Sequence, residues 1–356
     1  MILNKTKKIF LTTLAISSSL NVFAQNDTTY YLQKQWEAFP IVNYDTDVGF
    51  GYGAKGFLYN FLGSEESFDI TIYNSTKGER WYQLIFSFPD KQRRHGKDYG
   101  SAFDFIIDYD KWIDFDFYSI RNNDFAKSTN TIEEYTREPI DISTIFSKTL
   151  TKSLIAESGF KYTSISCYDM PSDGTLKPIS NSHVQNLSFL LNFLYDTRTD
   201  LIHPKEGFLL QLNNEFARDI NGGKQSFIRN KIMLQYYFPI FSPDIILASR
   251  IAYERMSNVE FPNKLALGGN NTIRGIPQDR YISESYILVN EEFRIPIWWR
   301  FGFILGVDIG NSKSTPNWIV NSILGLRFYM DNFIVRADYG IGKNTTGFYF
   351  NFGHLF

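Results

Sequence analysis

The chain has few of the residues on which disulfide-stabilised folds and most catalytic or metal sites depend. Cys167 is the only cysteine among 356 residues, so no internal disulfide can form. The four histidines lack the spacing of metal ligands, and no serine lies in a nucleophile motif. They are His95, His183, His203 and His354. We therefore expect no enzyme activity, no cofactor and no bound metal.

An excess of positive charge is also missing. Lys and Arg total 36 against 38 Asp and Glu, which gives a formal net charge of −2. A protein that binds nucleic acid needs a basic face to neutralise phosphates. This charge balance argues against a nucleic-acid partner.

Long hydrophobic runs are absent as well. Residues 295–307 come nearest, but that stretch is short and contains Arg300. A membrane-spanning helix needs about 20 consecutive apolar residues. The sequence therefore excludes a helical membrane protein.

The N-terminus has the pattern of an export signal. Lys5, Lys7 and Lys8 precede a short apolar stretch over residues 9–20, and small or tolerated residues end at Ala24. We predict a cleaved signal peptide over residues 1–24, which leaves 332 residues (356 − 24) starting at Gln25. A single membrane anchor is the alternative, although the apolar stretch is short for it. No cysteine follows the signal, so no lipid attachment site is expected there.

Aromatic residues are abundant, with 33 Phe, 22 Tyr and 6 Trp. Apolar side chains also alternate with small or charged ones through most of the chain, which is typical of strands with two different faces. Residues 303, 305, 307 and 309 are apolar and alternate with Ile304, Gly306 and Asp308. Residues 333, 335, 337 and 339 likewise alternate with Ile334, Arg336 and Asp338. Composition alone would also fit a soluble β-sandwich with an aromatic core.

Charged or small residues opposite an apolar face indicate lipid outside and a wet lumen inside. We predict an all-β fold, a transmembrane antiparallel β-barrel of about 16 strands over residues 47–356. Residues 25–46 are expected to form a short periplasmic N-terminal segment. Short turns alternate with longer polar loops, and with both termini periplasmic the loop over residues 261–280 is extracellular.

This long loop contains a motif that can be compared with known families. Gly268-Gly269 is followed by Ile273-Arg274-Gly275-Ile276. The segment resembles the Gly-Gly and Val-Arg-Gly-Phe/Tyr motif of the BamA/TamA superfamily of outer-membrane barrels, the bacterial surface antigen family. Ile273 and Ile276 depart mildly from that pattern.

The resemblance implies that the loop folds back into the barrel, where Arg274 contacts acidic residues of the wall. Glu292 matches the family's Glu-x-Arg-x-Pro strand, and Asp308 matches its Gly-x-Asp-x-Gly strand. The alternation independently places both acids on the inner face of consecutive strands. The alternative is a surface arginine and two ordinary lumen charges.

Two further matches extend the resemblance over about the last 160 residues. Asp196-Thr-Arg198, with Pro204 and Gly207 downstream, resembles a family segment at a periplasmic turn, and it also fits an ordinary charged hairpin. The chain ends on an aromatic strand with Phe352 and Phe356. This ending resembles the C-terminal signal by which outer-membrane barrels are recognised for assembly.

Family members that insert or secrete proteins usually carry periplasmic POTRA domains before the barrel. Only Gln25 to about Asp47 precede the first expected strand, which is too short for one folded domain. We therefore expect a member without POTRA domains. Its expected partners are outer-membrane lipid and lipopolysaccharide, substrate polypeptides and a separate periplasmic accessory protein.

The leading hypothesis is a barrel that assists insertion or translocation of proteins at the outer membrane. Gly49, Gly51 and Gly53 are expected on the inner face of the first strand, where they would weaken its pairing with the last strand. Such a seam could open and pair with an incoming strand. The alternative is a passive solute channel or structural barrel that retains the fold without assembly activity.

Overall fold

The computed structural model describes residues 34–118, 132–172, 174, 176, 183–223, 225–259, 261–330 and 333–356. The predicted signal peptide over residues 1–24 lies outside the described residues.

Within these ranges nearly all of the regular structure is β-strand. The barrel strands are β1 (Gln35–Asp45), β2 (Gly49–Tyr59), β3 (Ser67–Ser75), β4 (Arg80–Phe88), β5 (Ala102–Tyr118), β6 (Ile132–Thr149), β7 (Leu154–Tyr168), β8 (His183–Asp196), β9 (Gly207–Asp219), β10 (Phe227–Ile240), β11 (Ser242–Ser257), β14 (Ser285–Trp298), β15 (Phe301–Ser312), β16 (Ile319–Tyr329), β17 (Ile334–Ile341) and β18 (Thr346–Phe352). Two short strands, β12 (Leu265–Leu267) and β13 (Tyr281–Ser283), form a separate hairpin, and α1 (Lys91–Arg94) is a single helical turn. In the described part of the chain, no helix is long and apolar enough to span a membrane.

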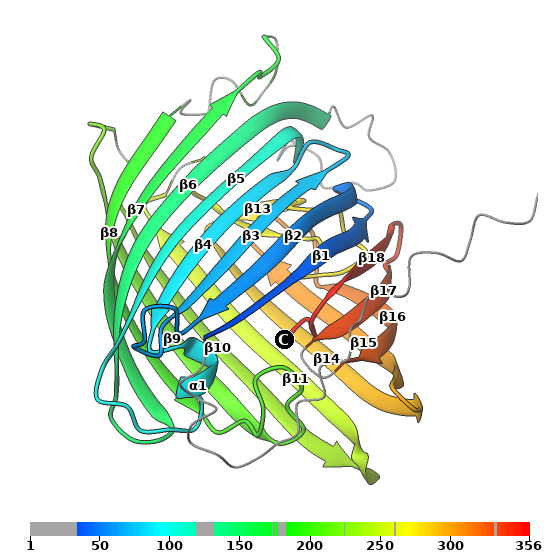
Figure 1. Ribbon diagram of the computed structural model, residues 1–356. Helices are drawn as coiled ribbons and strands as arrows, with labels where there is room; N and C mark the ends of the chain where they lie inside the picture. Colours follow the sequence, from blue (N-terminus) through cyan, green and yellow to red (C-terminus); the bar gives the residue numbers. More distant parts are fainter. Residues whose placement is uncertain are drawn as a thin grey trace, which may run out of the picture. The chain divides into compact units, whose positions relative to one another are not determined.

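The described barrel strands form one closed antiparallel sheet of 16 strands (Figure 1). Each strand pairs with its neighbours in the chain, and β1 pairs with β18 to close the sheet. Closure leaves no fully open sheet edge, which a lipid environment would not tolerate. The predicted fold class and strand number are confirmed.

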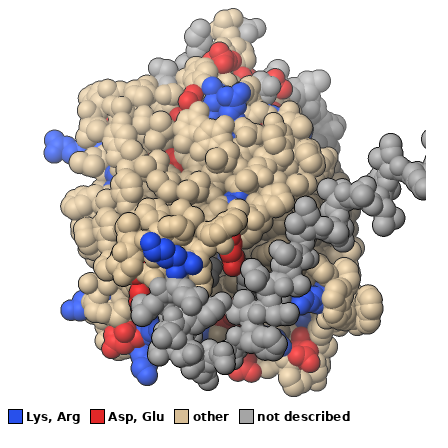
Figure 2. Space-filling model, in the orientation of Figure 1, with Lys and Arg blue, Asp and Glu red and all other residues tan. Residues whose placement is uncertain are grey.

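The two faces of the strands differ as the alternation predicts. On β16, Leu324 and Leu326 point outward and are 41% and 54% exposed. On β17, the inward-facing Arg336 and Asp338 are 3% and 0% exposed. On the face shown in Figure 2, the middle of the barrel surface is mostly uncharged, and most of the charged side chains lie toward its two ends. This arrangement fits a barrel whose outer surface contacts lipid.

The connections divide between the two ends of the barrel. One end, which we call the turn end, carries the tight link Trp299–Arg300 and the segment over residues 197–206. The other, the loop end, carries the longest described connection, residues 258–284, between β11 and β14. This connection follows the eleventh strand, as expected. We predict that the turn end faces the periplasm.

The barrel begins earlier than residue 47, so the expected N-terminal boundary is wrong. Gln35–Asp45 forms strand β1, and Gly49, Gly51 and Gly53 lie on the second strand rather than at the seam. Glu37 and Pro40 obscure the strand pattern of this segment. Proline is tolerated there because this part of β1 has a register partner on β2 but none on β18 among the described residues.

The chain turns inward after β18, which also corrects an expectation. Gly353 has φ +77°, a conformation that favours glycine, and it ends the strand beyond Phe352. Phe356 therefore does not continue the outward face of the strand. It packs against the buried cluster of Tyr237, Ile246 and Ala248 on the inner wall.

Candidate functional site

The candidate site is built from the connection between β11 and β14, which we call the inner loop (residues 258–284). The loop folds back into the barrel, and its apolar side chains join one buried cluster with the wall. These include Leu265, Leu267, Ile273 and Ile276, with exposed fractions of 6% or less. Burying these groups gives the loop a fixed position against the wall, so the motif that it carries is held in the lumen.

Arg274 is the centre of the site and is fully buried. Its Nε and Nη2 atoms donate to both oxygens of Asp308 at 2.9 Å, a bidentate pair. Its Nη1 atom donates to Glu292 at 2.8 Å and to Asp338 at 2.8 Å. The structure thus brings the arginine to both acids that the sequence singled out and to a third.

Strand register explains why the acids converge. Glu292 lies on β14 opposite Gly306 of β15, and Asp338 lies on β17 opposite Gly325 of β16. A Cβ at Gly325 would clash with Asp338 Oδ1 and Arg327 Nη1, so this glycine leaves room for the carboxylate and its arginine partner. The planar fork of the Arg274 guanidinium can bind several carboxylates at once. Asp308 on β15 completes the set and also accepts a hydrogen bond from Asn290 at 2.7 Å.

Further arginines surround the three acids, and the sequence analysis did not assign them to the site. Arg327 donates to Asp338 and Glu292, and Arg294 donates to Glu292 at 3.2 Å. Arg336 lies 3.6 Å from Asp338. The alternation had placed Arg336 and Asp338 on the inner face, but nothing in it indicated that they reach Arg274.

The balance of charge keeps Arg274 protonated. Burial alone would lower the pKa of its guanidinium, but Asp308, Glu292 and Asp338 outweigh burial and hold that pKa above its ordinary value. Together the four arginines and three carboxylates carry a formal charge of +1. Removing one partner from such a buried group costs more than the pair contributes, because the remaining charges stay desolvated.

Gly275 allows the loop backbone to approach the wall closely. It has φ +88°, and a Cβ at this position would lie 2.8 Å from the carbonyl carbon of Gly340 on β17. Its N–H donates to the Tyr349 hydroxyl at 2.9 Å, and Thr345 donates to its carbonyl at 2.5 Å. The motif is therefore attached to β18, the last strand, as well as to the strands that carry the acids.

Gly268 and Gly269 form hydrogen bonds with Thr272 and Ile276 within the same loop. Thr272 Oγ1 donates to the Gly268 carbonyl at 2.8 Å, and Gly269 N–H donates to the Ile276 carbonyl at 2.9 Å. These bonds hold residues 268–276 as a compact hairpin around Arg274. The sequence motif thus fixes both the shape of the loop and its attachment.

The motif of Asp196 and Arg198 lies at the turn end, between β8 and β9. Arg198 donates from Nε and Nη2 to the two oxygens of Asp196 at 3.0 and 2.8 Å. Pro204 is buried in the same turn, and Gly207 begins β9. This arrangement stabilises the turn locally, and it makes no contact with Arg274.

The seam between β1 and β18 is much shorter than the other strand pairs. It has two register pairs, Tyr44 with Phe350 and Asp45 with Tyr349, whereas every other neighbouring pair of barrel strands has at least seven. Thr46 adds hydrogen bonds to Phe348 next to these pairs. All of these contacts lie near the loop end, and Figure 1 shows β1 and β18 side by side.

Toward the turn end, aromatic side chains replace the missing ladder. Phe39 of β1 stacks on Phe333, just before β17, with ring centroids 6.0 Å apart. Phe39 also contacts Phe57 of β2, and Phe333 contacts Phe352 of β18, at 5.7 and 5.9 Å. These four rings, which we call the aromatic closure, hold this part of the seam without β1–β18 backbone hydrogen bonds among the described residues.

Comparison with family models decides the relationship. Residues 60–356 match the Omp85 superfamily domain. The chain belongs to the Omp85 superfamily. The match runs from the end of β2 to the end of the chain, so it includes the inner loop and the wall strands that carry the acids.

Three solved structures have a similar fold. BamA from Haemophilus ducreyi lacking POTRA domains 1–3 is 14% identical, with a TM-score of 0.64, over 90% of this chain and 70% of that one. CdiB from Escherichia coli is 13% identical, with a TM-score of 0.61, over 90% and 63%. CdiB from Acinetobacter baumannii is 13% identical, with a TM-score of 0.55, over 92% and 67%. A search of curated protein sequences gave no match.

Membership of the Omp85 superfamily makes this chain an outer-membrane protein of a family whose barrels serve protein transport and assembly rather than catalysis. The inner loop and the short seam are therefore the two features from which its role can be argued.

Proposed function

We propose that the barrel inserts or translocates polypeptides at the outer membrane by opening between β1 and β18. The observation that carries this proposal is the seam of two register pairs in an otherwise fully paired sheet. Opening it breaks few backbone hydrogen bonds, and the turn-end part of β1 already lacks a β18 partner among the described residues. An incoming strand that pairs with this edge recovers the missing hydrogen bonds by β-augmentation.

The inner loop supports the proposal because it is tied to the seam. Gly275 binds the hydroxyl of Tyr349, and Tyr349 is itself the register partner of Asp45 across the seam. The buried ion pairs of Arg274 and Arg327 with Glu292, Asp308 and Asp338 therefore link β14 to β17. The bond from Gly275 to Tyr349 adds β18, so these strands form one fixed wall. The moving part is then the N-terminal side of the barrel, beginning with β1.

A disulfide across the seam tests the proposal. Tyr44→Cys with Phe350→Cys places thiols at register partners, whose Cα separation of about 4.5–5.5 Å suits a disulfide. The control is Leu305→Cys with Leu324→Cys, also outward-facing register partners, on β15 and β16. Cys167, which is buried on β7, is replaced by alanine in every variant.

The readout is quantitative proteomics of the outer membrane in cells that depend on each variant. Under oxidising conditions we expect cells that depend on the seam variant to have lower levels of other barrels or surface lipoproteins in the outer membrane. Addition of a reductant should restore these levels. The control variant should retain them in both conditions. If the oxidised seam variant supports a normal outer membrane, opening at the seam is not the mechanism.

A passive solute channel is the second candidate, and a lumen cavity of about 790 Å³ favours it. Depletion of the protein distinguishes the two roles. An unchanged outer-membrane proteome together with steady conductance of the purified barrel in planar bilayers would favour the channel.

Export and partners complete the proposal. We propose that residues 1–24 are removed as a signal peptide, which N-terminal sequencing of the mature protein tests by finding Gln25 first. We also propose a separate periplasmic accessory protein, which cross-linking at the turn end followed by mass spectrometry would identify.

A further inference from the structure

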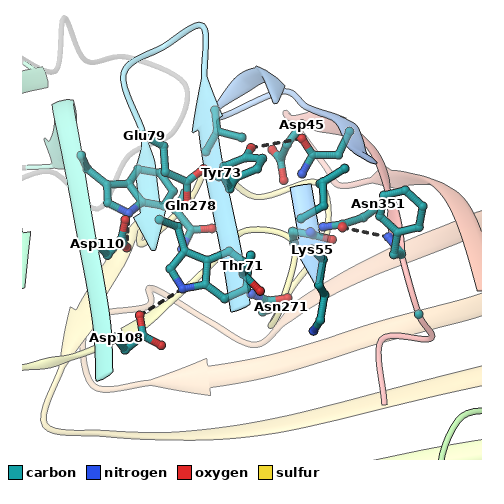
Figure 3. A pocket seen from close by; sticks show the side chains of 18 of the residues that line it. Asp45, Lys55, Thr71, Tyr73, Glu79, Asp108, Asp110, Asn271, Gln278 and Asn351 are labelled. Atoms are coloured by element: carbon teal, nitrogen blue, oxygen red, sulfur yellow. Dashed lines mark hydrogen bonds between the residues drawn. The ribbon is translucent and has the colours of Figure 1, made fainter. Parts of the chain in front are cut away.

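The lumen contains a second region that the Arg274 site does not use. A cavity of about 790 Å³ lies against β1–β5, and the inner loop borders it with Asn270, Asn271, Gln278 and Asp279. The motif around Arg274 packs on the wall from β14 to β18, whereas Phe261 at the start of the loop contacts Phe117 of β5 and Tyr135 of β6. The cavity lies beside the loop and is not filled by it. Figure 3 shows the side chains that point into the cavity from neighbouring strands.

Carboxyl groups outnumber cationic groups in the cavity. Two cations, Lys55 and Arg137, face a larger set of carboxyl groups, which gives a formal charge of −3 when every group is ionised. The carboxyl groups are Asp45, Glu79, Asp108, Asp110 and Asp279. Burial raises the pKa of Glu79, in the β3–β4 turn, to about 8, and a bound cation favours its ionised form. Enclosed charge of one sign attracts ligands of the other sign.

Two buried polar atoms in the cavity have no hydrogen-bond partner among the described residues. Thr71 is 1% exposed, and its hydroxyl makes no hydrogen bond to any described residue. Asp110 binds the Trp112 indole through Oδ2 at 2.5 Å, while its Oδ1 has no described partner. An unpartnered buried acceptor is costly, and a ligand that donates a hydrogen bond removes the cost.

The walls fix the orientation of these acceptors. Asp108 accepts from the Trp81 indole at 3.0 Å and from Gln83 at 2.5 Å. Asp108, Asp110 and Trp112 follow one another at every second residue of β5, so they share the inner face. The tryptophan rings also provide surfaces on which a cationic group can stack.

Another part of the cavity is aromatic and adjoins the seam, with the Lys55 ammonium 5.0 Å from the Phe57 ring centroid. Phe39, Phe57, Phe333 and Phe352, the aromatic closure, all line it. A ligand that fills the cavity therefore meets carboxylates at one part and phenyl rings at another. The phenyl rings lie beside the stretch of β1 that lacks a β18 partner.

We propose that this cavity binds an extended polypeptide segment that carries basic and apolar side chains. The lysine or arginine groups donate to Asp108 and Asp110, and the apolar groups pack on the aromatic closure. This inference rests on the proposed function and names the class of polypeptide that the barrel receives. The site holds the segment in the lumen next to the β1 edge.

A binding measurement on the full-length protein in detergent tests the site. The probe is a fluorescently labelled, end-blocked hexapeptide of alternating lysine and phenylalanine, followed by anisotropy. The same peptide with glutamate for lysine is the comparison. We expect the basic peptide to bind at least about tenfold more tightly, and the difference to shrink as salt increases.

Variants locate the binding. Asp108→Asn with Asp110→Asn should weaken binding of the basic peptide by about tenfold or more. Asp244→Asn with Glu284→Gln removes the same formal charge from exposed positions outside the cavity and should leave binding unchanged. Thr71→Val keeps the size of the side chain, and it should weaken binding by about fivefold through the lost hydroxyl. Circular dichroism verifies that each variant retains its sheet.

Equal binding of the basic and acidic peptides would overturn the inference, as would equal losses in the cavity and control variants. The outcome is separable from that of the proposed function. If the peptide binds in the cavity but depletion of the protein leaves the outer-membrane proteome unchanged, the binding site is supported and the insertion role is rejected. If depletion reduces other outer-membrane proteins but the peptide does not bind, only the binding site is rejected.

Discussion

Arg274→Ala is the most informative perturbation of the inner loop. The change removes four side-chain hydrogen bonds to Asp308, Glu292 and Asp338, all of which are fully buried. Glu292 and Asp338 retain neighbouring arginines. Among the described residues, however, Asp308 has no other cation at ion-pair distance. The loss of folding free energy should therefore come mainly from the buried Asp308 carboxylate, which is left without a cation in the described part of the chain.

The size of the effect follows from this distribution. Breaking a buried ion pair by removing one partner costs about 3–5 kcal/mol. We expect the lower part of that range for Arg274→Ala, because two of the three acids remain paired. Adding Asp308→Asn removes the isolated charge and should recover about 1–3 kcal/mol. Arg274→Lys should be intermediate, since one ammonium group cannot reproduce the bidentate pair.

Two measurements on the protein in detergent micelles check this reasoning. Denaturant unfolding followed by tryptophan fluorescence gives the loss of stability. Trypsin cleavage after Lys264 or Arg280 reports release of the inner loop. Arg255→Ala, at an exposed position on β11, is the control. A wild-type unfolding midpoint together with an uncut loop in Arg274→Ala would refute the role assigned to the buried cluster.

Three further predictions concern other parts of the structure. Gly275→Ala should cost about 1–3 kcal/mol more than Gly222→Ala in denaturant unfolding, since both glycines have positive φ but only the first would place its Cβ against another strand; equal costs would contradict the close approach. Burial lowers the pKa of His203 from 6.5 to about 4, so the folded state keeps it neutral; stability should fall as pH drops from 6.5 to about 4, and His203→Gln should reduce this slope in melting experiments. Phe39→Ala should weaken the aromatic closure by about 0.5–1.5 kcal/mol and increase hydrogen exchange along β1, whereas Phe103→Ala, in an outward pair between fully paired strands, should not affect β1.

The alternation of side chains predicted much of this barrel because strands have a period of two. It placed Asp308 and Asp338 on the inner face, and both are fully buried there. It could not show which inner charges meet. That depends on the height of each residue along the tilted strands and on the path of the inner loop. The resemblance supplied the link from Arg274 to Glu292 and Asp308, whereas the arginine neighbours became visible only in the structure.

The ends of the barrel were harder to predict. Strand β1 contains Glu37 and Pro40, and most of it pairs on one side only, so it lacks the regular pattern of a strand between two neighbours. The turn at Gly353 was also missed. Continued alternation beyond Phe352 suggested a longer strand, but contacts of Phe356 with Arg294 and Tyr237 hold the end of the chain inside. Long-range contacts of this kind leave no local signal.

The separation of charge across the lumen has a consequence for anything that enters it. The buried arginines over β14–β17 exceed their carboxylates by one formal charge, whereas carboxyl groups predominate in the cavity over β3–β5, so the charge of the lumen is uneven and an electric field exists inside it. In physiological salt, mobile ions screen such a field over a Debye length of about 8 Å. The screening is weaker where the protein excludes water. If the barrel receives polypeptides as proposed, this field would turn the basic side chains of an entering chain toward β5. The barrel would then set which face of the chain is presented to the edge of β1.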